Sequence, residues 1–182
     1  MVSQDLEFFR HDHPVLAEAG VFRWQASLPK AGMYRLLGDY YPTGATPQLT
    51  AKTIFVPGGH WQIPHLDADR TVKHAANIDV ELLSEPPAPM AGLKTMLFFR
   101  VDPADGLEPY LGAWGHMLTA SDDLIDLIHT HPFLAAPDGV PGKQIQFNVI
   151  FPRARTYRIW VQFQRRGVVN TAVFTVPVSE LK

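Results

Sequence analysis

A segment near the start of the chain recurs near its middle, and this internal repeat constrains the fold more than any other feature. Residues 2–14 read VSQDLEFFRHDHP, and residues 120–132 read ASDDLIDLIHTHP. Aligned without a gap, the first segment shares Ser3, Asp5, Leu6, His11, His13 and Pro14 with Ser121, Asp123, Leu124, His129, His131 and Pro132 of the second. A chain that repeats a motif in this way is expected to build the same supersecondary unit twice.

A second pair of matching segments follows in the same order. Residues 29–35 read PKAGMYR and residues 152–158 read PRARTYR, so both share Pro, Ala, Tyr and Arg. Further on, Gly44 matches Gly167, and each copy ends in a β-rich run, LTAKTIFV and TAVFTVPV. We therefore predict two tandem modules. The first covers residues 1–70 and includes the linker, and the second covers residues 71–182.

The two copies differ at the front. Before its His-x-His-Pro motif the second copy has residues 73–128, whereas the first has only residues 1–10. The first copy therefore lacks counterparts of the strands that open the second. We expect the first module to be truncated, and the chain to be a fragment or to begin after the true start. A stop codon directly upstream in the gene would contradict this.

Short alternating segments separated by turn residues predict β-structure throughout. In residues 21–28, Phe22, Trp24, Ala26 and Leu28 alternate with polar residues, as in a half-buried strand. The other predicted strands cover residues 33–40, 49–56, 78–83, 94–101, 114–120, 125–130, 144–150, 157–164 and 170–178. Sixteen Pro and 13 Gly supply the turns between them. The pattern predicts an all-β fold of antiparallel sandwiches, with a small barrel as the alternative.

Composition removes several classes of function. The chain has no Cys, which excludes disulfides, thiolate metal sites and cysteine nucleophiles. A net charge of −2 gives no electrostatic support for nucleic-acid binding. No apolar run approaches the roughly 18 residues of a membrane span. Neither a Ser-His-Asp order nor a phosphate-binding loop is present. The remaining candidates for chemistry are the eight His residues.

Three of these histidines are predicted to converge on one hairpin. His129 and His131 are two residues apart, so on a strand they project from the same face. With a turn centred between Asp122 and Asp123, His116 on the preceding strand would pair with His129 and share that face. Three neutral imidazoles with an open fourth position suit Zn²⁺ or Cu²⁺. We therefore predict a copper or zinc site at His116, His129 and His131.

The same motif has a simpler interpretation, which stays open. An imidazole at the end of a strand can hydrogen-bond a loop carbonyl, and the following Pro then ends the strand. The first copy keeps His11 and His13, which would form a two-ligand site unless His60 or His65 folds back. We expect His60 and His65 to be solvated residues of the linker.

Catalysis is not expected at this hairpin. A three-His zinc site can activate water, but that mechanism also needs a nearby acid or base. The candidate carboxylate is Asp126, which the predicted register pairs with Thr119, on the face away from the imidazoles. The sequence therefore predicts a binding protein and not an enzyme.

Part of the second copy resembles a known family. The segments are IDVELLSEPPAPMAGLKTMLFFRV, LEPYLGAWGHMLTASDDLIDLIHTHP and IQFNVIFPRARTYRIWVQFQRRG, and Gly-His-Met followed by His-x-His-Pro is their distinctive part. They resemble the YtkA-like domains, which are small immunoglobulin-like sandwiches outside the bacterial cytoplasm and are associated with copper and other heavy metals. The resemblance implies two immunoglobulin-like modules in tandem, the first incomplete, and a periplasmic or extracellular location.

Two functions follow from this sequence as expectations. The first is an extracytoplasmic β-sandwich that binds copper or zinc through the histidine cluster. The alternative is a metal-free immunoglobulin-like module for protein interaction or structure. In the alternative, open sheet edges of the truncated copy would pair two chains into a homodimer.

Overall fold

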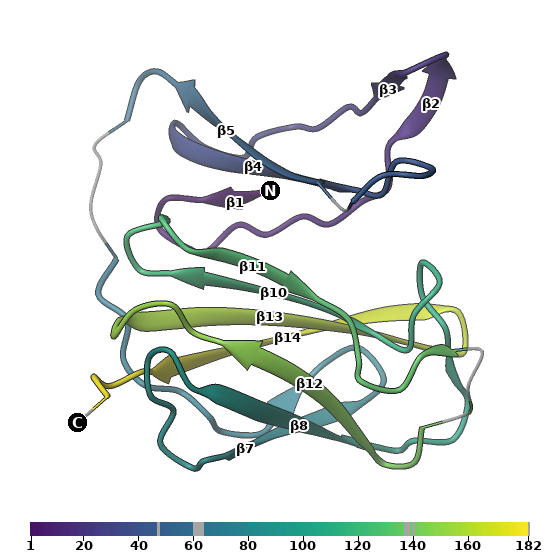
Figure 1. The fold of residues 1–182 in the computed structure, drawn as a ribbon, viewed down its shortest axis with the longest axis vertical. Helices are drawn as coiled ribbons and strands as arrows, with labels where there is room; N and C mark the ends of the chain where they lie inside the picture. The colour runs from purple at the N-terminus through teal and green to yellow at the C-terminus, as the bar shows by residue number, and fades with distance from the viewer. Residues whose placement is uncertain (47, 60–63, 137–138, 140, 182) are drawn as a thin grey trace. The chain divides into compact units, whose positions relative to one another are not determined.

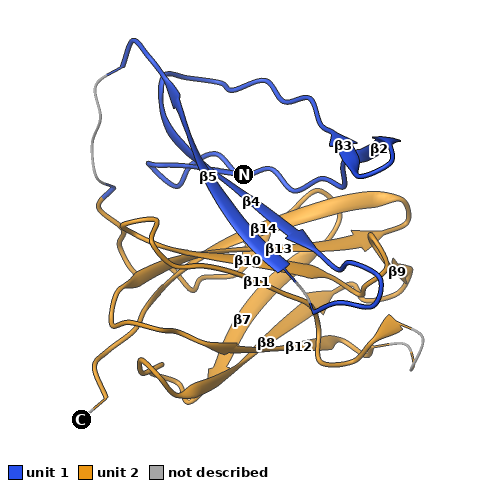
Figure 2. Ribbon diagram, turned by 45° about the horizontal axis from the view of Figure 1, so that its top comes forward, with its two compact units in different colours: residues 1–64 blue, residues 65–182 orange. Residues whose placement is uncertain are grey.

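The computed structural model describes residues 1–46, 48–59, 64–136, 139 and 141–181. It divides into two compact units, unit 1 (residues 1–64) and unit 2 (residues 65–182), which Figure 2 shows in different colours. Antiparallel strands make up the regular structure of both units, so the predicted all-β class is confirmed. Within the described parts of the chain we find no helix with the length and apolarity that crossing a membrane requires.

Unit 1 is built from a three-stranded sheet and a separate two-stranded hairpin. Its strands are β1 (Val2–Ser3), β2 (Val15–Glu18), β3 (Val21–Arg23), β4 (Gly32–Tyr40) and β5 (Gln48–Val56). The sheet has the order β1-β4-β5, and β2 pairs with β3 alone. β4 and β5 form a long hairpin that is paired from Gly32↔Val56 to Tyr40↔Gln48.

The strand predicted over residues 21–28 ends at Arg23, so the remainder of that prediction is wrong. Side-chain contacts replace the expected ladder at this point. The indole nitrogen of Trp24 donates a hydrogen bond of 2.7 Å to Asp12, and the guanidinium of Arg10 lies 5.3 Å from the centre of the indole ring. Alternation alone does not distinguish such a tethered loop from a strand.

Unit 2 contains two antiparallel sheets. Its strands are β6 (Lys73–His74), β7 (Asp79–Glu85), β8 (Lys94–Asp102), β9 (Leu107–Glu108), β10 (His116–Ser121), β11 (Leu127–Thr130), β12 (Gln144–Ile150), β13 (Thr156–Arg165) and β14 (Val168–Pro177). One sheet has the order β11-β10-β13-β14, with β9 added beside β13, and the other has the order β12-β8-β7-β6. Figure 1 shows the two sheets as successive layers.

The core of unit 2 lies between these sheets, which makes the unit a β-sandwich. Buried residues of both sheets form one apolar cluster, and Phe99 of β8 lies at its centre. The ring centroid of Phe99 lies 5.5 Å from Phe147, 6.0 Å from Phe163 and 5.8 Å from Phe174. Successive residues of a strand face opposite sides of the sheet, so the residues between the core positions lie on the outer face of each sheet.

The β10–β11 hairpin differs in register from the prediction. Leu118 pairs with His129, and Met117 pairs with Thr130, so the expected pairing of His116 with His129 is wrong by two residues. The turn is centred one residue later because Leu124 adopts a left-handed φ of 56°. A two-residue shift leaves every side chain on its predicted face, since the period of a strand is two.

The same shift corrects the position of Asp126. Its carbonyl accepts a hydrogen bond of 3.0 Å from the amide of Ser121, so Asp126 lies opposite Ser121. Thr119 pairs with Ile128 instead.

Candidate metal centre

The three histidines predicted to converge do meet in unit 2. His131 contacts both of the other rings edge to face, with centroid separations of 4.7 Å to His116 and 4.8 Å to His129. The rings of His116 and His129 are nearly parallel, 5.7 Å apart with an angle of 5° between their planes. One ligand nitrogen of His116 and one of His129 lie within 4.8 Å of each other.

The strand β10 aims His116 away from the sandwich core. Its neighbour Met117 is fully buried in the apolar cluster, and successive residues of a strand face opposite sides. Gly115 lets the strand begin close to β13. A Cβ atom there would lie 2.8 Å from ring carbons of Phe163 and 2.9 Å from the carbonyl oxygen of Gln162. The Gly of the Gly-His-Met motif therefore has a packing role, and the His has the outward position.

A turn before β10 holds His116 from the other side. The Nε2 atom of His116 lies 2.8 Å from the carbonyl oxygen of Tyr110. The Tyr110 ring also meets the imidazole edge to face, at a centroid distance of 5.6 Å. Sequence reasoning missed this partner, because no local pattern connects Tyr110 with the histidine cluster.

The three rings differ in their access to solvent. His116 is buried at 3% exposure, His129 is half-buried and His131 is exposed. The cluster therefore has one buried imidazole and one that is open to solvent.

The remaining histidines belong to other segments of the chain. His11 and His13 belong to unit 1, where their ring centroids are 5.8 Å apart at an angle of 80°. His65 is largely exposed, and its Nε2 lies 3.2 Å from a carboxylate oxygen of Asp67, in keeping with a solvated linker residue. His60 lies outside the described residues.

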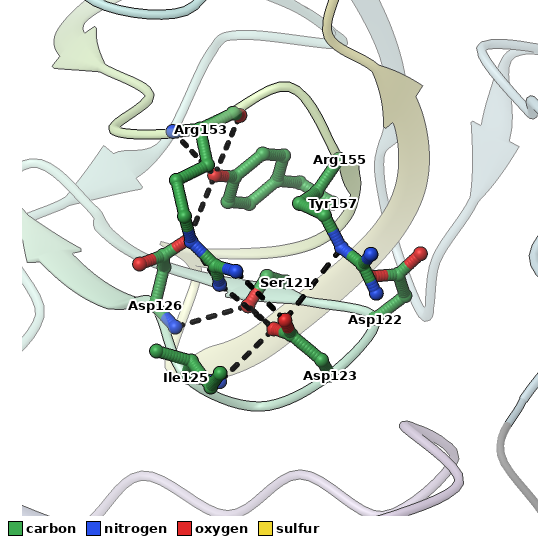
Figure 3. Close-up of polar contacts among 8 residues, drawn as sticks. All are labelled: Ser121, Asp122, Asp123, Ile125, Asp126, Arg153, Arg155 and Tyr157. Carbon is green, nitrogen blue, oxygen red and sulfur yellow. Dashed lines mark hydrogen bonds and ion pairs between the residues drawn. The ribbon is translucent and has the colours of Figure 1, made fainter.

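The turn that joins β10 to β11 is held by an ionic network, drawn in Figure 3. The hydroxyl of Ser121 donates to Asp123 at 2.6 Å and accepts from the amide of Asp126 at 2.9 Å. Arg153 reaches across from the loop before β13 and donates to Asp123 at 2.8 Å and to Asp126 at 2.9 Å. Hydrogen bonds from Arg153, and then from Ser121, lower the pKa of Asp123 below its usual value.

Tyr157 completes this network as a tyrosine corner, in which a tyrosine hydroxyl hydrogen-bonds the backbone a few residues upstream. Its hydroxyl lies 3.0 Å from the carbonyl oxygen of Arg153, four residues upstream, and 2.9 Å from a carboxylate oxygen of Asp126. Burial, and then the hydrogen bond with Asp126, raise the pKa of the Tyr157 hydroxyl well above its ordinary value. The network joins the histidine-bearing hairpin to β13 and so supports the register of the hairpin.

The arginines around this turn are partners of carboxylates. Arg155 lies 2.7 Å from Asp122, and Arg153 contacts Asp123 and Asp126 as described above. Paired guanidinium groups of this kind hold a turn in place.

These features define unit 2 as an antiparallel β-sandwich with a tyrosine corner and a cluster of three imidazoles on one hairpin. Residues 73–180 match the model of a family described as a domain of unknown function (DUF8832), and the chain belongs to this family. A search of curated proteins found none that matches the chain.

Proposed function

We propose that unit 2 binds a Zn²⁺ or Cu²⁺ ion through His116, His129 and His131. The observation that carries this proposal is the spacing of the rings, 4.7, 4.8 and 5.7 Å between centroids. Three imidazoles that bind one ion at about 2.0–2.1 Å in a tetrahedral arrangement have ring centroids roughly 5 Å apart. The observed separations lie near this value, so the three rings are close enough together to share one ion.

The surroundings of the cluster favour binding over catalysis. Besides the imidazoles, the same face of the hairpin presents Leu118, Ala120 and Leu127. The carboxylate of Asp126 is held by Arg153 and contacts the Tyr157 hydroxyl. A hydrolytic zinc site uses a nearby acid or base, whereas a carrier needs only ligands and an open position. We therefore assign the site to metal carriage or storage.

The exposed position of His131 supports reversible loading. An ion that enters from solvent meets His131 first and reaches the buried His116 last. With three protein ligands, the fourth position is left for water or for the ligand of a donor or acceptor molecule. The resemblance to YtkA-like domains supports the same function and a periplasmic or extracellular location.

We further propose that the two units are copies of one module, of which unit 1 retains the later part. The turn at residues 3–8 repeats the hydrogen bonds of the turn at residues 121–126, and the hairpin β4–β5 corresponds to β13–β14. In this scheme His11 and His13 correspond to His129 and His131. They would form a second and weaker site, because two ligands hold an ion less firmly than three.

Metal titration tests the main proposal. Tag-free protein is stripped with a chelator and titrated with Zn²⁺ and, separately, with Cu²⁺, and His129→Ala is compared with His74→Ala as the matched control. His74 lies in unit 2 with its Nδ1 2.7 Å from Asp79, so its loss should leave the site intact. Wild type and His74→Ala should bind one tight equivalent, and His129→Ala should bind about 100-fold more weakly or worse. Equal affinity in all three proteins would refute the site.

A second candidate function rests on the β2–β3 hairpin of unit 1. Val15 is 72% exposed, Leu16 59% and Phe22 61%, so this hairpin presents apolar side chains to solvent. Exposed apolar strands of this kind serve protein association, including dimerisation through a sheet edge. Under this alternative the chain is a metal-free interaction module. A monomeric sedimentation profile up to high protein concentration would argue against such a dimer.

A further inference from the structure

The turn formed by residues 110–113 fixes which nitrogen of His116 is available to a metal ion. The Nε2 atom of His116 lies 2.8 Å from the Tyr110 carbonyl oxygen. A carbonyl oxygen can only accept a hydrogen bond, so Nε2 must carry the proton. In a neutral imidazole the lone pair then resides on Nδ1, the nitrogen through which a metal ion would be bound.

The turn is built to hold that carbonyl in place. Tyr110 and Ala113 exchange two backbone hydrogen bonds, of 2.8 and 3.0 Å, across Leu111 and Gly112. Leu111 has a φ of 48° and Gly112 a φ of 86°, so both central residues are left-handed, as in a type I′ turn. A leucine in this conformation is disfavoured and persists where the surrounding contacts determine the backbone.

The Tyr110 side chain, like its carbonyl, restrains the imidazole of His116. Its ring packs edge to face on the imidazole at 5.6 Å, which restricts rotation of the ring about χ2. Carbonyl and ring together thus specify both the tautomer and the orientation of His116. Histidines that bind metal ions are commonly oriented by a hydrogen bond from their second nitrogen to a carbonyl or carboxylate.

We infer that Tyr110 and its turn are the positioning element of the proposed metal site, and that His116 binds the ion through Nδ1. This inference rests on the proposed metal-binding function. It adds residues 110–113, which no sequence motif marks, and it specifies the ligand atom. The turn orients the ligand and does not itself contact the ion.

Two substitutions at one position separate positioning from folding. Gly112→Pro cannot adopt a φ of 86°, because the proline ring holds φ near −65°, so the turn must open. Gly112→Asn is the matched control, since Asn tolerates the left-handed region and a Cβ there meets nothing within 4 Å. Zn²⁺ affinity should fall about 10–100-fold in Gly112→Pro and stay within about threefold of wild type in Gly112→Asn.

The nitrogen assignment has its own readout, which also applies if Gly112→Pro fails to fold. Long-range ¹H–¹⁵N spectra of metal-free wild-type protein should show the Nε2–H tautomer for His116, and added Zn²⁺ should shift Nδ1. An Nδ1–H tautomer, or binding of Zn²⁺ through Nε2, would overturn the inference and leave the metal site standing. Unchanged Zn²⁺ affinity in a folded Gly112→Pro would do the same. Absence of Zn²⁺ binding in wild type would overturn both proposals.

Discussion

The turn at residues 3–8 of unit 1 and the turn at residues 121–126 of unit 2 have the same internal structure in different settings. Ser3 donates to Asp5 at 2.5 Å, as Ser121 donates to Asp123 at 2.6 Å. The backbone amide five residues after the serine, that of Phe8 or of Asp126, donates to the serine hydroxyl at 2.9 Å in both turns. The leucine in each turn is left-handed, with φ of 57° at Leu6 and 56° at Leu124.

The tyrosine beside each turn also matches. Tyr34 pairs with Ser3 and its hydroxyl donates to the carbonyl of Lys30 at 2.7 Å. Tyr157 pairs with Ser121 and its hydroxyl lies 3.0 Å from the carbonyl of Arg153. Lys30 forms ion pairs with Asp5 and Glu7, in the place where Arg153 binds two aspartates. Thus the same set of local contacts forms around both turns.

What differs is the packing behind the corner. In unit 2 the sheet that carries β13 packs on a second sheet through the phenylalanine-rich core. In the described part of unit 1 the corresponding strands belong to one three-stranded sheet, and the other two strands form a separate hairpin. The comparison teaches that the corner is a local structure, whereas the sandwich depends on which other strands are present.

The largest effect is expected from the core between the two sheets of unit 2. Phe99→Ala should lower the free energy of unfolding of unit 2 by about 3–5 kcal/mol, because it leaves a cavity among three aromatic rings. Phe55→Ala in β5 is the matched control, since Phe55 is 58% exposed and its loss should change stability by about 0.5 kcal/mol or less. Urea unfolding measures the loss of stability in each variant. Hydrogen exchange of the amides of β8 and of β5 shows which unit has been destabilised. Equal losses would contradict the packing difference.

A smaller effect should distinguish the two tyrosine corners. Tyr157→Phe removes a hydroxyl that contacts a carbonyl and the Asp126 carboxylate, so we expect a loss of about 1.5–3 kcal/mol. Tyr34→Phe removes the hydrogen bond to the Lys30 carbonyl and should cost about 0.5–1.5 kcal/mol. The two variants are compared by urea unfolding of the full chain. A larger loss for Tyr34→Phe would show that the second corner does not depend on its carboxylate.

Low pH is expected to reduce the free energy of unfolding, because the turn at residues 121–126 depends on the ionised carboxylate of Asp123. The folded-state pKa of Asp123 is below its usual 3.8, so its ionised form stabilises the fold above that value and this stabilisation is lost as the pH falls below it. Asp123→Asn should therefore have a flatter stability profile between about pH 5 and pH 2 than wild type. Unfolding by urea at a series of pH values provides the measurement, and parallel profiles would be the contrary result.

Asp5 in unit 1 provides the comparison for this titration. Burial alone would raise the pKa of Asp5, but hydrogen bonds from Lys30 and Ser3 outweigh it and lower the pKa. Asp5→Asn should therefore change the acid profile in the same direction as Asp123→Asn. A change in the opposite direction would break the correspondence between the turns.

The smallest effect on metal affinity is expected from the histidines of unit 1. The double variant His11→Ala, His13→Ala should retain the tight equivalent of Zn²⁺ and lose only weaker binding, because the proposed site uses three ligands of unit 2. Isothermal titration of metal-free protein measures both classes of binding. Loss of the tight equivalent in this variant would contradict the assignment of the site to unit 2.

Much of the fold was predictable because its signals are short in range. The strand predicted over residues 144–150 is β12, with the same bounds, since Ile145, Phe147 and Val149 alternate with polar residues. The histidine face was also predicted, although the register was not. An error of two residues preserves the face of every side chain, so the three imidazoles met despite the misplaced turn.

The sequence by itself determined the all-β class, the likeness of the turns at residues 3–8 and 121–126, and the face of the hairpin that carries His116, His129 and His131. Each depends on residues a few positions apart, whose backbone preferences and side-chain directions follow from local chemistry. Only the tertiary structure decided where the hairpin turns, which guanidinium holds it, and that the Tyr110 carbonyl meets His116. Those contacts join separate loops and strands, and their geometry depends on how the strands pack, which no local pattern encodes.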